Sequence, residues 1–389
     1  MLLRLSNARV FAPEPLGVRD LFIAGGRVVG ITATNEKTAP SATHEVDLGG
    51  RRVIPGLVDG HAHLTGGGGE SGFASRVPPV PLSRFTRAGV TSVVGVLGTD
   101  DVTRDTESLV AAAYALREEG IGAWCHCGGY HLPPVTITGS VKKDIVFIDP
   151  VIGVGELAIS DHRSSQPTLD ELLRVASEAH VAGIMTGKAG ILHLHLGDGG
   201  RGLELVRQAL AASELPPRVF NPTHVNRQPA LFEEALALAR QGSTVDITAY
   251  PVEEGDPSLP AAVALCRYLE SGAPADRVTV SSDGGGCLPV FDADGVMQHM
   301  DVGSPACLVE TLAALVAEDL PLETVLPAFT SNAAKLLRLH DRGRIAEGSS
   351  ADLVVLDDED RVADVMAAGA WHVRDGETII HGVFERRDP

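Results

Sequence analysis

The sequence is poor in aromatic side chains, which make up 4% of its residues, although hydrophobic residues reach 44%. We therefore expect an aliphatic core, as in proteins whose parallel strands are buried between helices. No stretch approaches the roughly 18 consecutive apolar residues of a membrane-spanning helix, and the first residues lack the apolar run of a signal peptide. These absences predict a cytoplasmic protein that is not embedded in a membrane.

Cysteine and basic residues are also scarce. The cysteines number 5, an odd count, and they are scattered, which is not the pattern of a disulfide framework. Lysine and arginine total 32 against 51 aspartates and glutamates, so the formal net charge is −19. That charge argues against binding to nucleic acid or to an anionic membrane surface. An anionic substrate would need local arginines to reverse the field at the site.

The two ends of the chain differ from its middle. Both ends consist of short strand patterns separated by tight turns, such as Gly25-Gly26 and Asp375-Gly376. Two β-rich ends around a different middle predict that residues 1–52 and 343–389 together form a small β-sandwich domain. Residues 53–342 are then the catalytic domain.

The middle alternates between strand and helix patterns. The predicted strands are 53–58, 91–97, 121–127, 151–157, 191–196, 219–224, 245–249 and 278–282, and most are separated by helix patterns. These eight strands predict an α/β fold that closes into a (β/α)₈ barrel, the TIM barrel. A doubly wound open sheet is the alternative, but no GxGxxG motif opens a helix to support it.

A metal site is indicated where the first of these strands ends, in the sequence VIPGLVDGHAHLTGGGGE. His61 and His63 are separated by one residue, so in a strand both imidazoles point to the same face. Imidazole is the commonest protein ligand for zinc-like metals. The glycines at 66–69 allow the backbone to fold closely around that point before Glu70. Two core histidines beside a flexible turn are the alternative at this stage.

Further potential ligands follow later strands. They are Glu156 in the fourth strand, His195 after the fifth, His224 after the sixth and Asp283 after the eighth. Because the carboxyl ends of barrel strands meet at one face, we expect all six residues to form one site. Four histidines and two carboxylates exceed the needs of one tetrahedral ion, which predicts two divalent cations bridged by Glu156. Nitrogen and oxygen ligands without a thiolate favour Zn²⁺, with Mn²⁺, Co²⁺ and Ni²⁺ as alternatives.

Motifs along nearly the whole chain resemble those of the isoaspartyl dipeptidases (β-aspartyl dipeptidases) of the amidohydrolase superfamily. They are DGHAH, HLTGGGGE, GTD at 98–100, GGYHLP at 128–133, AISDHR at 158–163, HLGD at 195–198, PTHVNR at 222–227, SSDGGG at 281–286 and GRIAEGSSADLVVLD from Gly343. The resemblance implies a metallo-dipeptidase in which a metal-bridging hydroxide hydrolyses the isopeptide bond of β-aspartyl dipeptides. It also implies a homo-oligomer, such as an octamer.

The resemblance further implies catalytic roles for individual residues. His61, His63 and Asp283 would hold the buried metal, and His195 and His224 the more exposed one. Asp283 would also act as general base and then general acid. The hydroxyl of Tyr130 would stabilise the oxyanion.

The same resemblance implies a set of substrate-binding residues. Glu70, Thr99 and Tyr130 would line the substrate pocket, with Glu70 binding the free α-amino group. Arg163 and Arg227 would bind substrate carboxylates, for which a planar guanidinium is suited. The glycine- and proline-rich segment at 128–149 is predicted to be a loop that closes over the site.

Two positions depart from the family pattern. Glu156 stands where the family has a carboxylated lysine, and both groups are singly negative bidentate oxygen donors. Cys287 stands where the family has a serine that helps to hold the substrate carboxylate, and a thiol is a weaker donor than a hydroxyl. The first departure bears on the metals, and the second on substrate affinity or preference.

Other histidines and cysteines have more ordinary explanations. Cys125, His126 and Cys127 lie in one predicted strand and are expected to pack in the core. His193 shares a face with His195 but lies one layer deeper, which predicts a residue that supports a ligand or fills the core.

Two alternative functions remain at this stage. One is a related binuclear amidohydrolase that acts on cyclic amides or N-acyl amino acids. The other is a metal-free scaffold that has the barrel without the chemistry, although all six ligand positions carry coordinating residues.

Overall fold

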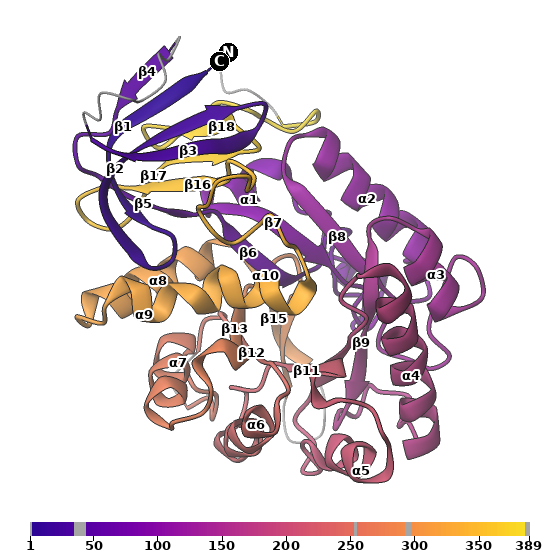
Figure 1. Ribbon diagram of the computed structural model, residues 1–389. Helices are drawn as coiled ribbons and strands as arrows, with labels where there is room; N and C mark the ends of the chain where they lie inside the picture. The colour runs from indigo at the N-terminus through magenta and orange to yellow at the C-terminus, as the bar shows by residue number, and fades with distance from the viewer. Residues whose placement is uncertain (1, 35–43, 253–254, 292–296, 386–389) are drawn as a thin grey trace.

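The computed structural model describes residues 2–34, 44–252, 255–291 and 297–385, and two sheets dominate it (Figure 1). The first joins the two ends of the chain, with the strand order β19-β18-β17-β16-β5-β1-β2-β3 and β4 paired with β1. Its strands are β1 (Leu3–Phe11), β2 (Pro15–Ala24), β3 (Arg27–Ala33), β4 (His44–Asp47), β5 (Arg52–Pro55), β16 (Leu353–Leu356), β17 (Val362–Ala367), β18 (Ala370–Arg374) and β19 (Glu377–Thr378). The expected meeting of the two ends is therefore present in this terminal sheet.

The chain passes from the terminal sheet to the second sheet within the predicted strand 53–58. In β5, Val53 pairs with Val10 of β1 and with Val355 of β16, so this strand belongs to the terminal sheet. A separate strand, β6 (Leu57–Ala62), begins the second sheet. The prediction of one continuous strand was wrong because residues buried in either sheet are equally apolar, which hides the switch.

The second sheet is parallel and curled (Figure 1). Its strand order is β11-β10-β9-β8-β7-β6, and β12 pairs separately with β13. The bounds are β7 (Val90–Gly95), β8 (Gly122–Cys127), β9 (Val151–Ile159), β10 (Leu192–Leu196), β11 (Phe220–Thr223), β12 (Val245–Thr248) and β13 (Val278–Ser281). Each predicted strand after the first therefore has a counterpart in the described residues, and β6 takes the place of the first.

Backbone hydrogen bonds link the β12–β13 pair to both edges of the six-stranded sheet. On one side the amide of Val225 donates to the carbonyl of Asp246 at 3.2 Å, and on the other the amide of Asp283 donates to the carbonyl of His61 at 3.1 Å. These bonds bring the chain after β13 next to the end of β6. Closure of all the strands into one continuous barrel stays a prediction.

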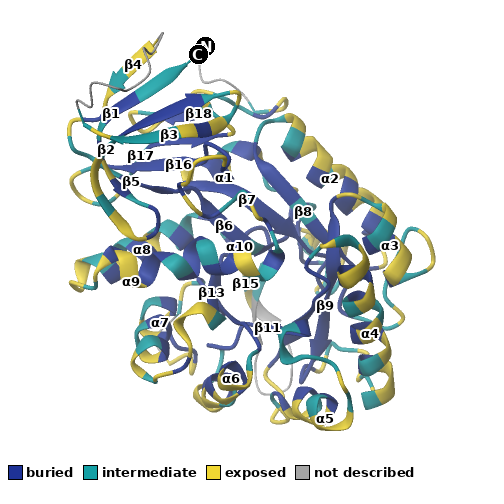
Figure 2. Ribbon diagram, in the orientation of Figure 1, coloured by how far each residue is buried: buried dark blue, intermediate teal, exposed yellow. Residues whose placement is uncertain are grey.

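Helices flank the parallel strands and turn their buried faces inward (Figure 2). They are α1 (Leu82–Arg87), α2 (Thr106–Glu118), α3 (Val141–Phe147), α4 (Leu169–Thr186), α5 (Glu204–Ala212), α6 (Pro229–Gln241), α7 (Ala261–Glu270), α8 (Ala306–Ala317), α9 (Leu322–Val325) and α10 (Ser331–Leu337), with the hairpin β14 (Cys287–Phe291) and β15 (Met297–Val302) before α8. Helix α3 lies inside the segment that was predicted to be a loop, so only part of 128–149 is irregular.

Helix α4 shows how local sequence sets the ends of an element. Thr168 and Glu171 form a reciprocal capping box at its start. Its C-cap is Gly187, which has φ 76°, so Gly183 lies inside the helix and does not end it. Gly183 instead permits close packing, because a Cβ there would lie 2.7 Å from the Cα of Gly190.

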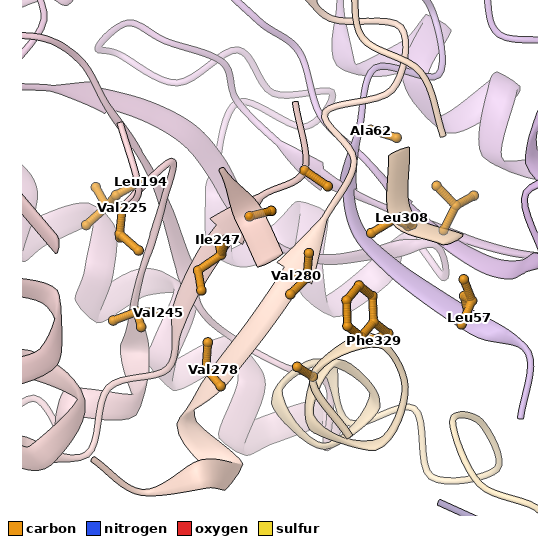
Figure 3. Close-up of a cluster of buried hydrophobic side chains, with 14 of the residues drawn as sticks. Leu57, Ala62, Leu194, Val225, Val245, Ile247, Val278, Val280, Leu308 and Phe329 are labelled. Carbon is orange, nitrogen blue, oxygen red and sulfur yellow. The ribbon is translucent and has the colours of Figure 1, made fainter. Parts of the chain in front are cut away.

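The core between the strands and helices is largely aliphatic, as expected. Figure 3 shows side chains of β6, β12 and β13 in one cluster with Leu308 and Phe329. Burying each such aliphatic side chain contributes about 1.5–3 kcal/mol relative to leaving it exposed. Within the described ranges, no helix has both the length and the apolarity required to cross a membrane.

Candidate metal centre and substrate pocket

The six predicted ligands meet at the carboxyl ends of the parallel strands. His61 lies in β6, Glu156 in β9 and His195 in β10. His63, His224 and Asp283 lie in the loops that follow β6, β11 and β13. None of the six is more than 6% exposed. We call these residues the metal cluster.

Glu156 lies between the two halves of the metal cluster. Its Oε1 is 3.6 Å from Nε2 of His61 and 3.5 Å from Nε2 of His63. Its Oε2 is 3.1 Å from Nδ1 of His195 and 3.5 Å from Nε2 of His224. Each carboxylate oxygen thus faces a different pair of histidines, which is the arrangement that a bridging ligand requires.

Asp283 completes the half that contains His61 and His63. Its Oδ1 lies 3.0 Å from Nε2 of His63 and 3.4 Å from Nε2 of His61. Two ligands bound tetrahedrally to one zinc ion at 2.0–2.1 Å are about 3.3–3.4 Å apart. The separations within the cluster are close to that value, so the residues present fit divalent metal ions.

Buried polar atoms that lack a hydrogen-bond partner also indicate that the cluster fits divalent metal ions. Nε2 of His61, Oε1 of Glu156 and Oδ1 of Asp283 are buried without a hydrogen-bond partner. Burying such atoms unpaired is costly unless something else satisfies them. Nε2 of His61 lies 3.6 Å from Oε1 of Glu156 and 3.4 Å from Oδ1 of Asp283, and a cation bound between this nitrogen and these oxygens would accept their lone pairs.

The tautomer of His61 is set by a chain of hydrogen bonds beneath the cluster. The side-chain amide of Asn221 donates to the carbonyl of Thr244 at 2.8 Å, so its Oδ1 is left to accept from Nδ1 of His193 at 2.7 Å. Nε2 of His193 then accepts from Nδ1 of His61 at 2.8 Å. This leaves the lone pair of His61 Nε2 directed into the cluster, and it gives His193 the supporting position that the sequence indicated.

The electrostatics of the cluster favour positive charge. Burial lowers the pKa of His61, but the negative charges of Glu156 and Asp283 outweigh it and raise that pKa to about 9. Burial raises the pKa of Glu156, yet the surrounding histidines hold it well below its ordinary value. The protein therefore stabilises ionised carboxylates next to a site that attracts a proton or a metal cation.

The neighbouring Cys125, His126 and Cys127 are buried in β8, as predicted. The imidazole ring of His126 lies 5.4 Å from that of His193. Burial lowers the pKa of His126 to about 3, so this ring is neutral. None of the three belongs to a potential metal-binding group among the described residues.

The glycine-rich loop after β6 brings Glu70 to the edge of the metal cluster. Gly66 has φ 78°, and a Cβ at this position would lie 1.9 Å from the carbonyl oxygen of Val77. The amide of Gly67 donates to the carbonyl of Gly285 at 2.8 Å, which ties the loop to the segment after β13. Only glycine allows this close path, as the sequence suggested.

A cavity of about 670 Å³ opens above the metal cluster. Its lining includes His63, His195 and Asp283 of the cluster. It also includes every residue that was predicted to bind substrate, namely Glu70, Thr99, Tyr130, Arg163, Arg227 and Cys287. We call these six residues the substrate rim, and the structure brings all of them together.

Glu70 is held by several neighbours. Its Oε1 accepts from Thr99 Oγ1 at 2.9 Å and lies 3.4 Å from Nη1 of Arg163. The Cys287 thiol lies 3.0 and 3.1 Å from its two oxygens. Cys287 therefore contacts the carboxylate of Glu70, whereas the resemblance had suggested contact with a substrate carboxylate.

Tyr130 and Arg227 both line the cavity. The Tyr130 hydroxyl is 2.8 Å from Nδ1 of His195, so it borders the metal cluster. Burial raises the pKa of Tyr130 well above its ordinary value, which keeps the phenol protonated. Nη1 of Arg227 lies 3.7 Å from Oδ1 of Asp198.

Sequence reasoning missed other residues at the site. Asp161 is buried beside His195 and Arg163, and its only sequence signal is its place two residues before Arg163 in the quoted AISDHR motif. Other polar residues also line the cavity, and of these only Asp198 belongs to a quoted motif, HLGD: Asp198, Gln228, Tyr250, Asp256, Ser258, His299 and Asp301.

Comparison with known proteins identifies the class of this fold and site. A profile of the amidohydrolase family matches residues 313–383. The crystal structure of the β-aspartyl dipeptidase from Fervidobacterium islandicum AW-1, in complex with β-Asp-Leu, has a TM-score of 0.90 and 41% identity, covering 97% of this chain and 98% of that one. The chain belongs to the amidohydrolase family.

More distant relatives carry other activities. An imidazolonepropionase of Mycolicibacterium smegmatis is 26% identical and covers 91% of this chain and 88% of its own length. The dihydropyrimidinase of Brevibacillus agri is 16% identical with a TM-score of 0.67, a likeness of fold alone. The family and its neighbours support a metal-dependent hydrolase and imply a TIM-barrel fold.

Proposed function

We propose that this protein is an isoaspartyl dipeptidase that hydrolyses the isopeptide bond of β-aspartyl dipeptides. The observation that carries the proposal is the joint presence, in one cavity, of a two-part metal cluster and a rim with one carboxylate and two guanidinium groups. The 41% identity to a β-aspartyl dipeptidase crystallised with β-Asp-Leu supports the same substrate class.

The charges of the substrate rim match a β-aspartyl dipeptide. Such a peptide has a free α-amino group, an α-carboxylate on the aspartyl residue and a second carboxylate on the leaving residue. Glu70 would pair with the ammonium, and Arg163 and Arg227 with the carboxylates. A peptide without the free amino group would lack the cation that pairs with Glu70 and would bind less tightly.

The metal cluster would hold two divalent ions, with Glu156 as the bridge and Zn²⁺ the favoured metal. Bound ions of this kind polarise a carbonyl and lower the pKa of water to about 7. Asp283 would accept the proton of the attacking water and deliver it to the leaving amine. The protonated phenol of Tyr130 would donate a hydrogen bond to the oxyanion.

The larger organisation is proposed with the function. Residues 53–342 would close into a complete TIM barrel, and residues 1–52 with 343–389 would be a separate β-sandwich domain. The pairing of β5 extends the terminal sheet to Pro55, which would move the first boundary slightly. We also propose a cytoplasmic homo-oligomer, an octamer by resemblance to the family.

The decisive experiment is steady-state hydrolysis of β-Asp-Leu beside α-Asp-Leu, with the metal content of the same sample measured. We expect two metal ions per chain and turnover of only the β-linked peptide. Two metals without turnover of β-Asp-Leu would favour the alternative amidohydrolase acting on cyclic amides or N-acyl amino acids. Absence of bound metal after zinc loading would favour the non-catalytic scaffold.

A further inference from the structure

Asp161 lies between the metal cluster and the substrate rim and touches both. It lies two residues after the last residue of β9, Ile159, and is 5% exposed. Its Oδ1 accepts from the backbone amide of Arg163 at 2.7 Å and from Nε of the same residue at 3.1 Å. Its Oδ2 accepts from Nη2 of Arg163 at 2.8 Å and lies 3.1 Å from Nε2 of His195.

The contacts of Asp161 determine which nitrogen of His195 carries a proton. Both nitrogens of His195 lie 3.1 Å from a carboxylate oxygen, Nδ1 from Oε2 of Glu156 and Nε2 from Oδ2 of Asp161. A carboxylate can only accept and a neutral imidazole carries one N–H, so a His195 that binds a cation through Nδ1 carries its proton on Nε2, where Asp161 accepts it. Nη2 of Arg163 is also 3.4 Å from this nitrogen, because both groups donate to the same oxygen of Asp161. The lone pair of His195 is then on Nδ1, which faces Oε2 of Glu156.

The same carboxylate fixes the guanidinium of Arg163. Nε and Nη2 form one edge of the planar group, and both are held by Asp161. The other terminal nitrogen, Nη1, lies on the side of Glu70, 3.4 Å from Oε1. A paired geometry of this kind holds a guanidinium in one orientation.

The backbone nearby is adapted to this position of Asp161. Gly197 follows β10, and a Cβ there would lie 2.4 Å from the Cβ of Asp161. The amide of Ser164 and the side chain of Gln166 both donate to the backbone carbonyl of Asp161, at 3.2 and 2.8 Å. These hydrogen bonds hold the backbone of Asp161, and the absence of a side chain at Gly197 leaves space for its carboxylate.

We propose that Asp161 is a positioning residue that links metal binding to substrate binding, by fixing the tautomer of His195 and the orientation of Arg163 at once. The inference rests on the proposed function for the identity of the substrate. The part of the inference that concerns metal binding depends only on contacts within this chain. Removing a carboxylate that accepts a hydrogen bond from a metal-binding histidine commonly weakens metal affinity by about 10–100-fold.

The test compares Asp161→Asn with Asp144→Asn by titrating zinc into the metal-free full-length protein against a chromophoric chelator. Asp144 is also fully buried, but it accepts from the amides of Ile137 and Thr138 at 2.8 and 2.9 Å, away from the metal cluster. We expect Asp161→Asn to weaken one of the two zinc-binding steps by about 10–100-fold. Asp144→Asn should bind zinc like the unaltered protein.

Kinetics at saturating zinc test the second half of the proposal. Asp161→Asn should raise KM for β-Asp-Leu more than it lowers kcat, because Arg163 is no longer held in place for binding. Unchanged zinc affinity in Asp161→Asn, or an equal loss in Asp144→Asn, would overturn the inference even if β-Asp-Leu is hydrolysed. If β-Asp-Leu is not hydrolysed, the zinc titration still decides the metal-binding part.

Discussion

The metal cluster and the substrate rim border the same cavity but are built differently. The cluster residues lie in the parallel strands or directly beyond their ends, and they are almost fully buried. The rim residues come from separate loops, except Cys287, which begins β14, and the contacts of Glu70 and Arg163 include several with other side chains. The metal cluster is therefore fixed by the sheet, whereas the substrate rim is held by side-chain networks that a single substitution can adjust.

The two regions also differ in how their charges are compensated. In the cluster, His61, Glu156 and Asp283 present buried atoms with no partner in the protein, which a bound cation would satisfy. In the rim, Glu70 already has donors in Thr99 and Cys287. Changes in the cluster should therefore abolish metal binding and catalysis, whereas changes in the rim should mainly alter KM.

The largest effect is expected from Glu156→Ala. Loss of the oxygen donor that faces both pairs of histidines should remove bound metal and lower kcat/KM by on the order of 10³-fold or more, since a metal contributes several kcal/mol to transition-state stabilisation. Metal analysis together with β-Asp-Leu kinetics measures both. A variant that retained two metals and normal turnover would show that Glu156 is not the bridge.

A second substitution at the same position sharpens this result. Glu156→Lys places the family's usual residue at the bridge, and lysine becomes a bidentate oxygen donor only when it is carboxylated. We expect added bicarbonate to increase the metal content and activity of this variant. The unaltered protein should not respond to bicarbonate, and a clear rescue of its metal-free form would contradict the role of Glu156.

The next largest effect is expected at Tyr130, which lies where the two regions meet. Tyr130→Phe removes the hydroxyl that lies 2.8 Å from His195 Nδ1. Loss of an oxyanion donor typically lowers kcat by about 10²–10³-fold. Metal content should stay the same, so steady-state kinetics and metal analysis are measured together. An unchanged kcat would remove Tyr130 from the oxyanion role.

A smaller effect, mainly on KM, is expected from Glu70→Gln. The substitution keeps the size of the side chain but removes the charge that would pair with the substrate ammonium, and KM should rise about 10–100-fold. The ratio of activities on free and N-acetylated β-Asp-Leu measures the role directly. That ratio should be large for the unaltered protein and smaller for the variant, and equal ratios would rule out recognition of the amino group by Glu70.

The smallest effect is expected from Cys287→Ser. A hydroxyl is a better donor to Glu70 than a thiol, so this variant should lower KM for β-Asp-Leu by less than about tenfold with kcat almost unchanged. Cys307→Ser is the matched control, because Cys307 is also partly buried but lies in α8 and does not line the cavity. An equal change in both variants would mean that the effect is not local to Glu70.

The sequence alone was sufficient to predict most of the parallel strands and the meeting of the six candidate ligands at one end of the sheet. Strand and helix periodicity is local, and the carboxyl ends of parallel strands must meet at one edge, so residues such as His61 and Asp283 could be grouped although they are far apart in the chain. The aliphatic composition likewise predicted the kind of core that the structure has.

Tertiary structure alone decided how those residues are arranged. The switch between sheets after Pro55 depends on pairing with distant strands, and the continuous apolar run conceals it. The opposed contacts of the two oxygens of Glu156, and the position of Asp161 between His195 and Arg163, depend on which loops approach one another. Local sequence determines the periodicity of each element, whereas contacts between side chains remote in sequence arise only when the whole chain is packed.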